Sequence, residues 1–171
     1  MSSVALATIA DLPELRLLLR DCAMHLGARG FRNWLAFDVA ASLERDLTER
    51  EVWLLREAGR LLGTWTVGTT PMRDYPPGFW PEDGRRALYL NRLAVAPSVQ
   101  HRGVGARCMA EAEARARSRS LEAIRLDYLS ANPALQRFYE RLGYAPVGEV
   151  PRGEWVFTAC EKRLDGPRAG A

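Results

Sequence analysis

The sequence has few of the residues from which metal centres and disulfide frameworks are built. It holds three cysteines and two histidines in 171 residues. Cys22, Cys108 and Cys160 are scattered and odd in number, which fits neither paired disulfides nor the short ligand spacings of zinc sites. We therefore expect no metal and three buried thiols. Cys108 has a second interpretation, since it lies just inside a predicted helix whose dipole can activate a thiol.

Other absences narrow the class of protein. The chain shows neither the Ser-His-Asp arrangement of a catalytic triad nor the lysine of a P-loop, so no motif supports a hydrolase or an NTP-hydrolysing enzyme. No run approaches the roughly 18 to 20 apolar residues of a membrane helix. The N-terminus shows no basic-plus-apolar export signal. We expect a cytoplasmic protein with no membrane partner.

Lysine is nearly absent as well. Lys162 is the only one, and arginine supplies the other basic residues. The net charge of +3 and the pI of about 9.0 permit an anionic partner. The arginines alternate with acids, as in 111–119, which is typical of a solvated helix face. We therefore expect no nucleic-acid partner.

What the sequence does contain predicts one mixed α/β domain. A chain of 171 residues, 47% of them hydrophobic, is long enough for a single core. We place this domain at 1–164 and expect 165–171 to be a flexible tail. Apolar periodicity and turn residues predict helices after Asp11, over 37–47, over 104–117 and after Asn132, and strands over 4–9, 52–57, 61–67, 88–95, 124–129, 147–150 and 154–163.

A long segment at 69–86 is rich in proline and glycine and carries Tyr75, Phe79 and Trp80. Irregular segments of this length often bind ligands. The three rings allow two interpretations, a binding loop or a loop that its aromatic side chains hold in place. Asp74, Glu82 and Asp83 on this segment would attract a cationic amine.

The most informative segment is the run from Gln100 to Ala106, between a predicted strand and a predicted helix. The first N–H groups of a helix have no intrahelical partner and carry partial positive charge, so they bind anions. Gly103 and Gly105 lack the Cβ atoms that would hold a phosphate away from these amides. The run therefore predicts a phosphate-binding loop.

A second pattern follows one strand and helix later. It consists of Asn132, Leu135, Tyr139, Gly143 and Tyr144. Together with Gln100, Gly103 and Gly105, it resembles the GNAT superfamily of acyl-CoA-dependent N-acetyltransferases, most strongly over 88–147. The resemblance implies a mostly antiparallel central sheet, flanked by helices and splayed between the strands that end near Val95 and Leu129.

The resemblance also implies acetyl-CoA as the co-substrate. Its binding residues would be Leu93, Ala94 and Val95 on the strand, Gln100, His101, Arg102, Gly103, Val104, Gly105 and Ala106 in the loop, and Asn132. The Val95 N–H would stabilise negative charge on the thioester oxygen. Asn132 also has the position of a helix N-cap.

Tyr139 is the expected general acid, because the resemblance places its phenol beside the leaving thiolate. Asp127 is the candidate general base, and an ion pair with a nearby arginine is an equally good interpretation of it. Strand alternation leaves open which face of 124–129 meets the cleft. Asn91 and Arg92 stand where other members carry a carboxylate. His25 and His101 are not expected to be catalytic.

We therefore expect an acetyltransferase that acts on a primary amine by direct attack in a ternary complex. A small-molecule acceptor is favoured. The alternatives are a protein N-terminus or lysine as acceptor, or an acyl-CoA-binding regulator without catalysis. A homodimer formed by the closing strands remains open.

Overall fold

The computed structural model describes residues 2–164, and the predicted tail at 165–171 lies outside them. Two compact units make up the chain. The first ends at Val67 and resumes from Asn91 to Ala110, and the second holds Gly68–Leu90 and the residues from Glu111 onward. Strand β4 (Ala87–Val95) and helix α4 (Val104–Ser118) each run from one unit into the other.

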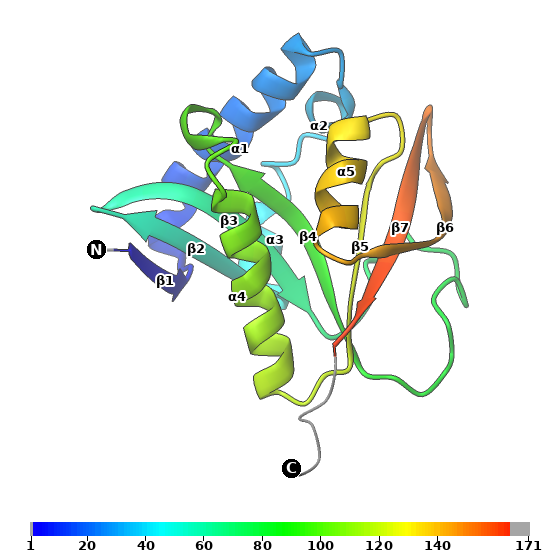
Figure 1. Ribbon diagram of the computed structural model, residues 1–171. Coiled ribbons are helices and arrows are strands. Elements are labelled where there is room, and N and C mark those ends of the chain that lie inside the picture. Colours follow the sequence, from blue (N-terminus) through cyan, green and yellow to red (C-terminus); the bar gives the residue numbers. More distant parts are fainter. Residues whose placement is uncertain (1, 165–171) are drawn as a thin grey trace. The chain divides into compact units, whose positions relative to one another are not determined.

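The strands form a mixed sheet of seven in the hydrogen-bonded order β1-β2-β3-β4-β5-β7-β6 (Figure 1). β4 and β5 are parallel, while β1 with β2, β2 with β3, β5 with β7, and β6 with β7 are antiparallel. The remaining strands are β1 (Ser2–Leu6), β2 (Glu51–Glu57), β3 (Arg60–Gly68), β5 (Ala123–Leu129), β6 (Ala145–Arg152) and β7 (Trp155–Arg163), and the remaining α-helices are α1 (Leu12–Ala28), α2 (Asn33–Ala36), α3 (Leu43–Glu49) and α5 (Pro133–Arg141). The predicted mixed α/β architecture is confirmed.

Two predicted elements near the N-terminus were wrong. The strand expected at 4–9 ends at Leu6, and a short 3-10 helix follows at Ile9–Asp11. The Thr8 N–H donates to Asp11 Oδ2 at 2.8 Å, which turns the backbone out of the extended conformation. The helix expected at 37–47 begins only at Leu43, as α3, because residues 37–42 form turns in which Asp38 adopts a φ of 41°. The short helix α2 lies before the expected range.

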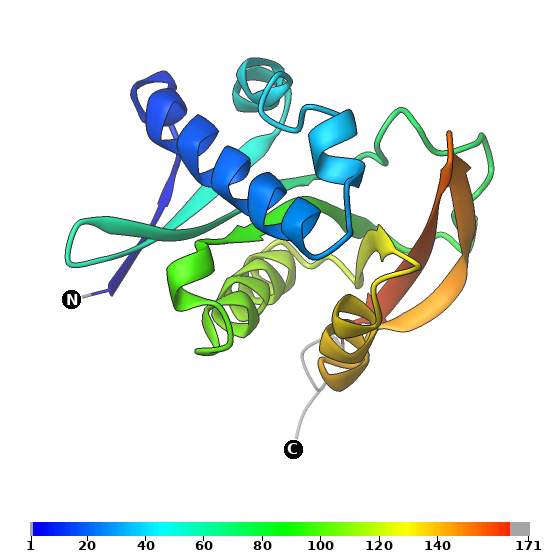
Figure 2. The same cartoon turned by 90° about the horizontal axis from the view of Figure 1, so that it is seen from above.

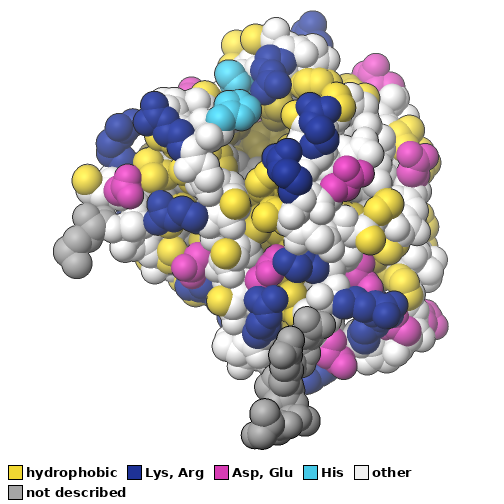
Figure 3. Space-filling model, in the orientation of Figure 1, with side chains coloured by type: hydrophobic (Ala, Val, Ile, Leu, Met, Phe, Trp, Pro, Cys, Tyr) yellow, Lys and Arg dark blue, Asp and Glu magenta, His cyan; other side chains and the backbone are white. Residues whose placement is uncertain are grey.

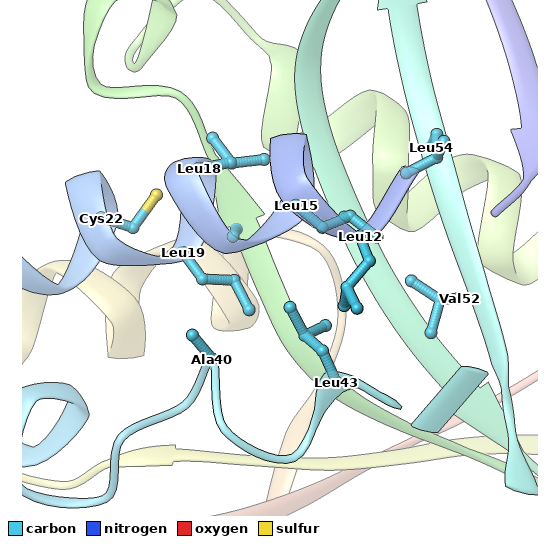
Figure 4. Close-up of a cluster of buried hydrophobic side chains, with 10 residues drawn as sticks. Leu12, Leu15, Leu18, Leu19, Cys22, Ala40, Leu43, Val52 and Leu54 are labelled. Carbon is cyan, nitrogen blue, oxygen red and sulfur yellow. The ribbon is translucent and has the colours of Figure 1, made fainter. Parts of the chain in front are cut away.

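The first unit packs α1 against its strands (Figure 2). Residues at helical spacing form the predicted apolar stripe, which is buried on β2 and on the chain around α3 (Figure 4). These core residues are Leu12, Leu15, Leu18, Leu19, Cys22, Ala40, Leu43, Val52, Leu54 and Ala94.

The second unit has a separate cluster made by Trp80, Ala87, Tyr89, Ala123 and Ala159. Helix α4 reaches strand β7 of this unit through a polar contact. The Lys162 ammonium lies 2.7 Å from Glu113 Oε1 and over the Tyr144 ring, and the Tyr144 hydroxyl donates to the same oxygen at 3.3 Å.

No described helix is long and apolar enough to cross a membrane. On the face drawn in Figure 3, basic and acidic side chains are interspersed.

Candidate active site

The loop before α4 contains two residues in the left-handed backbone conformation. His101 and Gly103 have positive φ angles of 62° and 79°, which open the turn before the helix begins at Val104. The Arg107 N–H donates to the Gly103 carbonyl at 3.0 Å, so the amides of the first helical turn precede the first intrahelical bond. Buried Val104 fixes this turn to the core, while His101 and Arg102 are exposed.

Strand β4 departs from regular geometry shortly before this loop. Its ladder with β5 joins Ala87–Tyr89 to Ala123–Arg125 and ends there. Arg92 has a φ of 52°, a left-handed conformation that bends a strand and frees its backbone groups. The described pairing of β4 with β5 is therefore confined to the first three residues of β4.

The Val95 carbonyl is held by two side chains of its own unit. Cys22 Sγ donates to it at 3.3 Å, and Gln100 Nε2 donates to it at 3.1 Å. The neighbouring Ala96 N–H donates to Leu62 on β3 at 2.9 Å. Because backbone groups alternate along a strand, the Val95 N–H points away from β3.

Gly63 is a residue of this half-site that sequence reasoning missed. A Cβ atom there would lie 3.0 Å from the Ala94 carbonyl and 3.1 Å from Cys108 Sγ. An isolated glycine within a run of strand-forming residues was the available signal. Cys108 is fully buried in this contact, so the core interpretation of this thiol is confirmed.

Arg92 and Asn91 have unusual environments. Arg92 forms an ion pair with the buried Asp46 on α3. Burial, with a smaller effect from Arg45, lowers the pKa of Arg92 to about 10. Both polar atoms of the Asn91 side chain are buried without a hydrogen-bond partner among residues 2–164.

In the second unit, Asn132 caps α5 as expected. Its side-chain oxygen accepts from the amides of Ala134 at 3.1 Å and Leu135 at 3.4 Å. Pro133 begins the helix and Gly143, with a φ of 86°, follows its end. The motif that carries Tyr139 is therefore a well-defined helix.

Tyr139 is buried by aromatic neighbours. Its ring stacks on Tyr128 at 5.5 Å and meets Phe138 and Tyr144 edge to face at 5.0 and 5.8 Å. Burial raises the pKa of Tyr139 far above that of a free phenol, and Cys160 and Asp127 add to the effect. The phenol therefore stays protonated at neutral pH.

Asp127 lies on the opposite face of β5 from Tyr128, its neighbour in the strand. Its Oδ2 accepts a hydrogen bond from the Tyr75 hydroxyl and another from Arg152 Nη2 at 2.7 Å. The pairing with an arginine that the sequence left open is thus present. Both donors use one oxygen, and Oδ1 accepts no hydrogen bond from any described residue.

The 69–86 segment is irregular, as predicted, and its rings hold it in place. Tyr75, Phe79 and Trp80 contact one another with centroids 5.1 to 5.4 Å apart, and Trp80 meets Tyr89 at 5.8 Å. This geometry favours the anchoring interpretation. The buried Arg125 also anchors this segment, since it lies over the Trp80 ring and its Nη1 donates to the Tyr89 hydroxyl at 2.9 Å.

The acidic residues of this segment are largely paired. Asp83 forms ion pairs with Arg85 and, at 3.7 Å, with Arg125. Asp74 pairs with Arg152 at 2.7 Å. Attraction of a cationic amine by Asp74 or Asp83 therefore requires a resident arginine to be displaced, whereas Glu82 forms no ion pair with any residue in 2–164.

The described residues contain no group of three or more potential metal ligands. All three cysteines are buried thiols, as predicted. The candidate groups in the first unit are the amides at the start of α4 and those of β4, and the candidate groups in the second unit are the Tyr139 phenol and the Asp127 carboxylate.

Comparison with known proteins identifies the family to which the chain belongs. The family model described as "Acetyltransferase (GNAT) family" matches residues 14–144. The chain is 28% identical over 159 residues to the uncharacterized N-acetyltransferase YesJ of Bacillus subtilis, covering 88% of this chain and 86% of that protein.

Solved structures agree on the fold. A GNAT-family acetyltransferase from Listeria monocytogenes has a TM-score of 0.78 at 24% identity, with 95% of each chain covered. The PaiA N-acetyltransferase of Thermoplasma acidophilum, in complex with coenzyme A, has a TM-score of 0.72 at 16% identity, with 96% of this chain and 99% of that chain covered. The structure of a putative acetyltransferase of Salmonella typhimurium with its cofactor acetyl-CoA has a TM-score of 0.64 at 20% identity. The match covers 98% of this chain and 96% of that chain.

Proposed function

This chain belongs to the GNAT family of acetyltransferases, and from that premise we propose that it transfers acetyl from acetyl-CoA to a primary amine of a small molecule. The reaction is direct attack in a ternary complex. The observation that carries the proposal is the open turn at His101 and Gly103, which precedes the free amides of α4. Such amides bind the pyrophosphate of a nucleotide.

The donor half-site follows from β4 and the loop. Amides of Val104, Gly105 and Ala106 would bind the pyrophosphate, and the exposed Arg102 adds positive charge beside it. The backbone of Leu93, Ala94 and Val95 would hold the pantetheine arm. The Val95 N–H would donate to the thioester oxygen as its charge develops. Asn132, which caps α5, would contact the same arm.

In the transfer step, the amine nitrogen attacks the thioester carbonyl carbon and forms the new C–N bond. The C–S bond then breaks, and the Tyr139 hydroxyl gives its proton to the departing thiolate. Asp127 Oδ1, which has no partner among the described residues, would accept the amine proton directly or through a water molecule.

Two observations support the rest of the proposal. The buried thiols fit a reducing cytoplasmic compartment. The anchored 69–86 segment packs in a cluster with Ala123 of β5 in its unit, which suits a small acceptor better than a protein chain.

Calorimetric titration with acetyl-CoA tests this proposal, with CoA and 3′-dephospho-CoA as comparison ligands. We expect saturable binding at one site per chain. Gly103→Ala should weaken acetyl-CoA binding by about tenfold or more, because its methyl group enters the phosphate-binding turn.

Gly84→Ala is the matched control, since Gly84 has a similar φ of 76° and a Cβ atom added at either glycine would meet no other atom within 4 Å. Both variants should lose about 1 to 2 kcal/mol of stability through backbone strain. Absence of acetyl-CoA binding in the wild type would overturn the proposal. Binding without turnover of any small or peptide amine would instead favour an acyl-CoA-binding regulator.

A further inference from the structure

The outer face of α1 carries large apolar side chains that the rest of the first unit does not cover. Leu17 and Met24 are 61% and 64% exposed. They lie seven residues apart, which is close to two helical turns, so they share one side of the helix. This side lies opposite the buried stripe drawn in Figure 4. The outer stripe consists of Pro13, Leu17, Arg20, Asp21, Met24 and Ala28, all of them exposed.

Helix α2 extends this apolar surface. Leu35 is 40% exposed, and a Cβ atom added at Gly27 would lie 2.6 Å from Leu35 Cδ1. The leucine therefore packs beside the C-terminal end of α1. Single apolar residues scattered over a surface are normal, whereas apolar residues that adjoin one another mark an interaction site.

The two charges at the centre of the stripe have no counter-charge within their own unit. Neither Arg20 nor Asp21 forms an ion pair with any residue in 2–164. They are neighbours in sequence, and neighbouring residues on a helix do not face each other. No acidic residue lies three or four positions from Arg20 along the helix. Both charges are therefore available to a partner.

The order of residues along the outer stripe is self-complementary. Its centre lies between Arg20 and Asp21, and each residue on one side has a chemically matching residue at the same distance on the other side. The matching pairs are Arg20 with Asp21, Leu17 with Met24, and Pro13 with Ala28. Two copies packed antiparallel about a two-fold axis at this centre would bring the members of each pair to the same level. The partner that this surface fits is therefore a second copy of the chain.

We propose that the outer face of α1 is the interface of a homodimer in which the two α1 helices pack antiparallel. Leu17 of one copy contacts Met24 of the other, and this contact occurs twice. The two Arg20 and two Asp21 side chains meet at the axis as a neutral group of four charges.

The charges decide the orientation of the pair. In a parallel arrangement each residue would lie level with its own copy, so Arg20 would face Arg20 and Asp21 would face Asp21. Like charges brought together in this way repel, and complementary charges favour the antiparallel arrangement. Ion pairs near solvent contribute little affinity, so the apolar contacts supply most of it.

The size of the surface sets the strength of the dimer. Helix α1 has 17 residues, which makes it about 26 Å long and about 10 Å wide. Such a strip is smaller than the roughly 800 Å² per partner of a standard interface. We therefore expect a reversible dimer with a Kd on the order of 10 to 100 μM. The interface lies within the first unit and does not depend on the proposed acetyltransfer.

Sedimentation velocity of the full-length protein, from about 10 μM to about 1 mM, tests the interface. The wild type should shift from monomer toward dimer across this range. Arg20→Glu places four acidic groups at the axis, and Asp21→Arg places four basic groups there, so each should weaken the dimer by about tenfold or more. The combined variant restores the neutral group and should dimerise within about threefold of the wild type.

Arg137→Glu is the matched control, because Arg137 is an exposed arginine of another helix, α5, and its substitution changes the net charge as Arg20→Glu does. It should dimerise as the wild type does. Met24→Gln removes an apolar contact without changing the charge and should also weaken the dimer. The substituted residues are exposed, so thermal unfolding of the variants should match that of the wild type. A wild type that stays monomeric throughout, or a dimer that none of the α1 variants weakens, would overturn the proposal.

Cross-linking tests the antiparallel register separately. The native thiols are buried, so a bis-maleimide should react with an introduced cysteine first. In the proposed dimer, position 17 of one copy is level with position 24 of the other, whereas the two copies of position 17 lie about 10 Å apart along the helix axis. A short cross-linker should therefore join Leu17→Cys to Met24→Cys in a mixture of the two variants. Equal cross-linking of either variant alone would contradict the antiparallel arrangement.

Discussion

The thiol of Cys22 on α1 donates a hydrogen bond to the backbone carbonyl of Val95 on β4, with 3.3 Å between sulfur and oxygen. Gln100 donates to the same carbonyl from the loop side at 3.1 Å. One carbonyl thus connects helix α1, strand β4 and the loop that precedes α4. The orientation of the adjacent Val95 N–H depends on this arrangement.

Replacing Cys22 should affect the donor site more than the chemical step. We expect Cys22→Ala to raise the KM for acetyl-CoA several-fold with little change in kcat, and to reduce stability by about 1 kcal/mol through the lost hydrogen bond. Cys22→Ser retains a donor and should recover most of the affinity. Steady-state kinetics with acetyl-CoA varied provides the measurement, and an unchanged KM in Cys22→Ala would contradict the role of the thiol.

The stability of the protein should fall in alkaline solution. Burial raises the pKa of Cys22 from 9.0 to about 12. The unfolded chain therefore releases this proton at a lower pH than the folded chain does. The stabilisation is complete below pH 9 and is lost as the pH rises toward 12.

Urea unfolding at several pH values checks this dependence. Above pH 9, the Cys22 thiol should lower the free energy of unfolding by up to about 1.4 kcal/mol for each further pH unit. Cys22→Ala should show a shallower decline than the wild type, and Cys160, whose pKa burial also raises, should contribute in the same direction. Identical slopes for wild type and Cys22→Ala would show that the thiol does not contribute.

Tyr139→Phe should reduce catalysis without unfolding the protein. The ring contacts survive, so we expect a stability change within about 0.5 kcal/mol. Loss of the proton donor should lower kcat by about 10²- to 10⁴-fold. The control is Tyr144→Phe, which removes a hydroxyl bonded to Glu113 and should change stability more than kcat. Normal turnover by Tyr139→Phe would exclude the phenol as the general acid.

Gly63→Ala should displace β4 from its position. The added methyl group would lie 3.0 Å from the Ala94 carbonyl, which belongs to backbone and cannot rotate away. We expect a loss of about 1 to 3 kcal/mol on urea unfolding, typical of an overpacked site, together with weaker acetyl-CoA binding. Full stability and unchanged affinity would mean that the strand adjusts without cost.

The edge strand β6 should not support dimerisation. Pro146 and Pro151 lack the N–H groups that a further strand would need, and both lie in β6, which ends the sheet order. We expect light scattering to show no dimer formed through this edge. Replacing both prolines with valine should increase self-association. A wild-type dimer that Glu149→Pro dissociates would contradict this prediction.

Much of the fold was predictable because its signals are local. The stripe on α1, the Ala58-Gly59 turn between β2 and β3, and the Asn132 cap each follow from the chemistry of a few neighbouring residues. The two errors near the N-terminus have the same physical origin. The pattern of apolar residues predicts neither the hydrogen bond between Thr8 and Asp11 nor the left-handed backbone conformation of Asp38.

Within the candidate site, the turn at Gly103 and the helix that carries Tyr139 were predictable from the sequence, and the ion pair of Asp127 was not. Glycine placement indicated the turn at Gly103, and the motif indicated Tyr139. The partner of Asp127 depends on Arg152, which is far along the chain, and on Tyr75, which lies in an irregular segment. Contacts of this kind depend on tertiary packing, so the spacing of residues in the sequence does not predict them.

The contact between Lys162 and Glu113 has a consequence for the protein's own chemical stability. A protein that handles an activated acetyl group exposes its own amines to it. Lys162 is the only lysine in the chain, and its ammonium group is bound by the Glu113 carboxylate and covered by the Tyr144 ring. The Lys162 side chain is only 24% exposed in this contact, so its amine is less accessible to an acetyl donor than the amine of an exposed lysine would be.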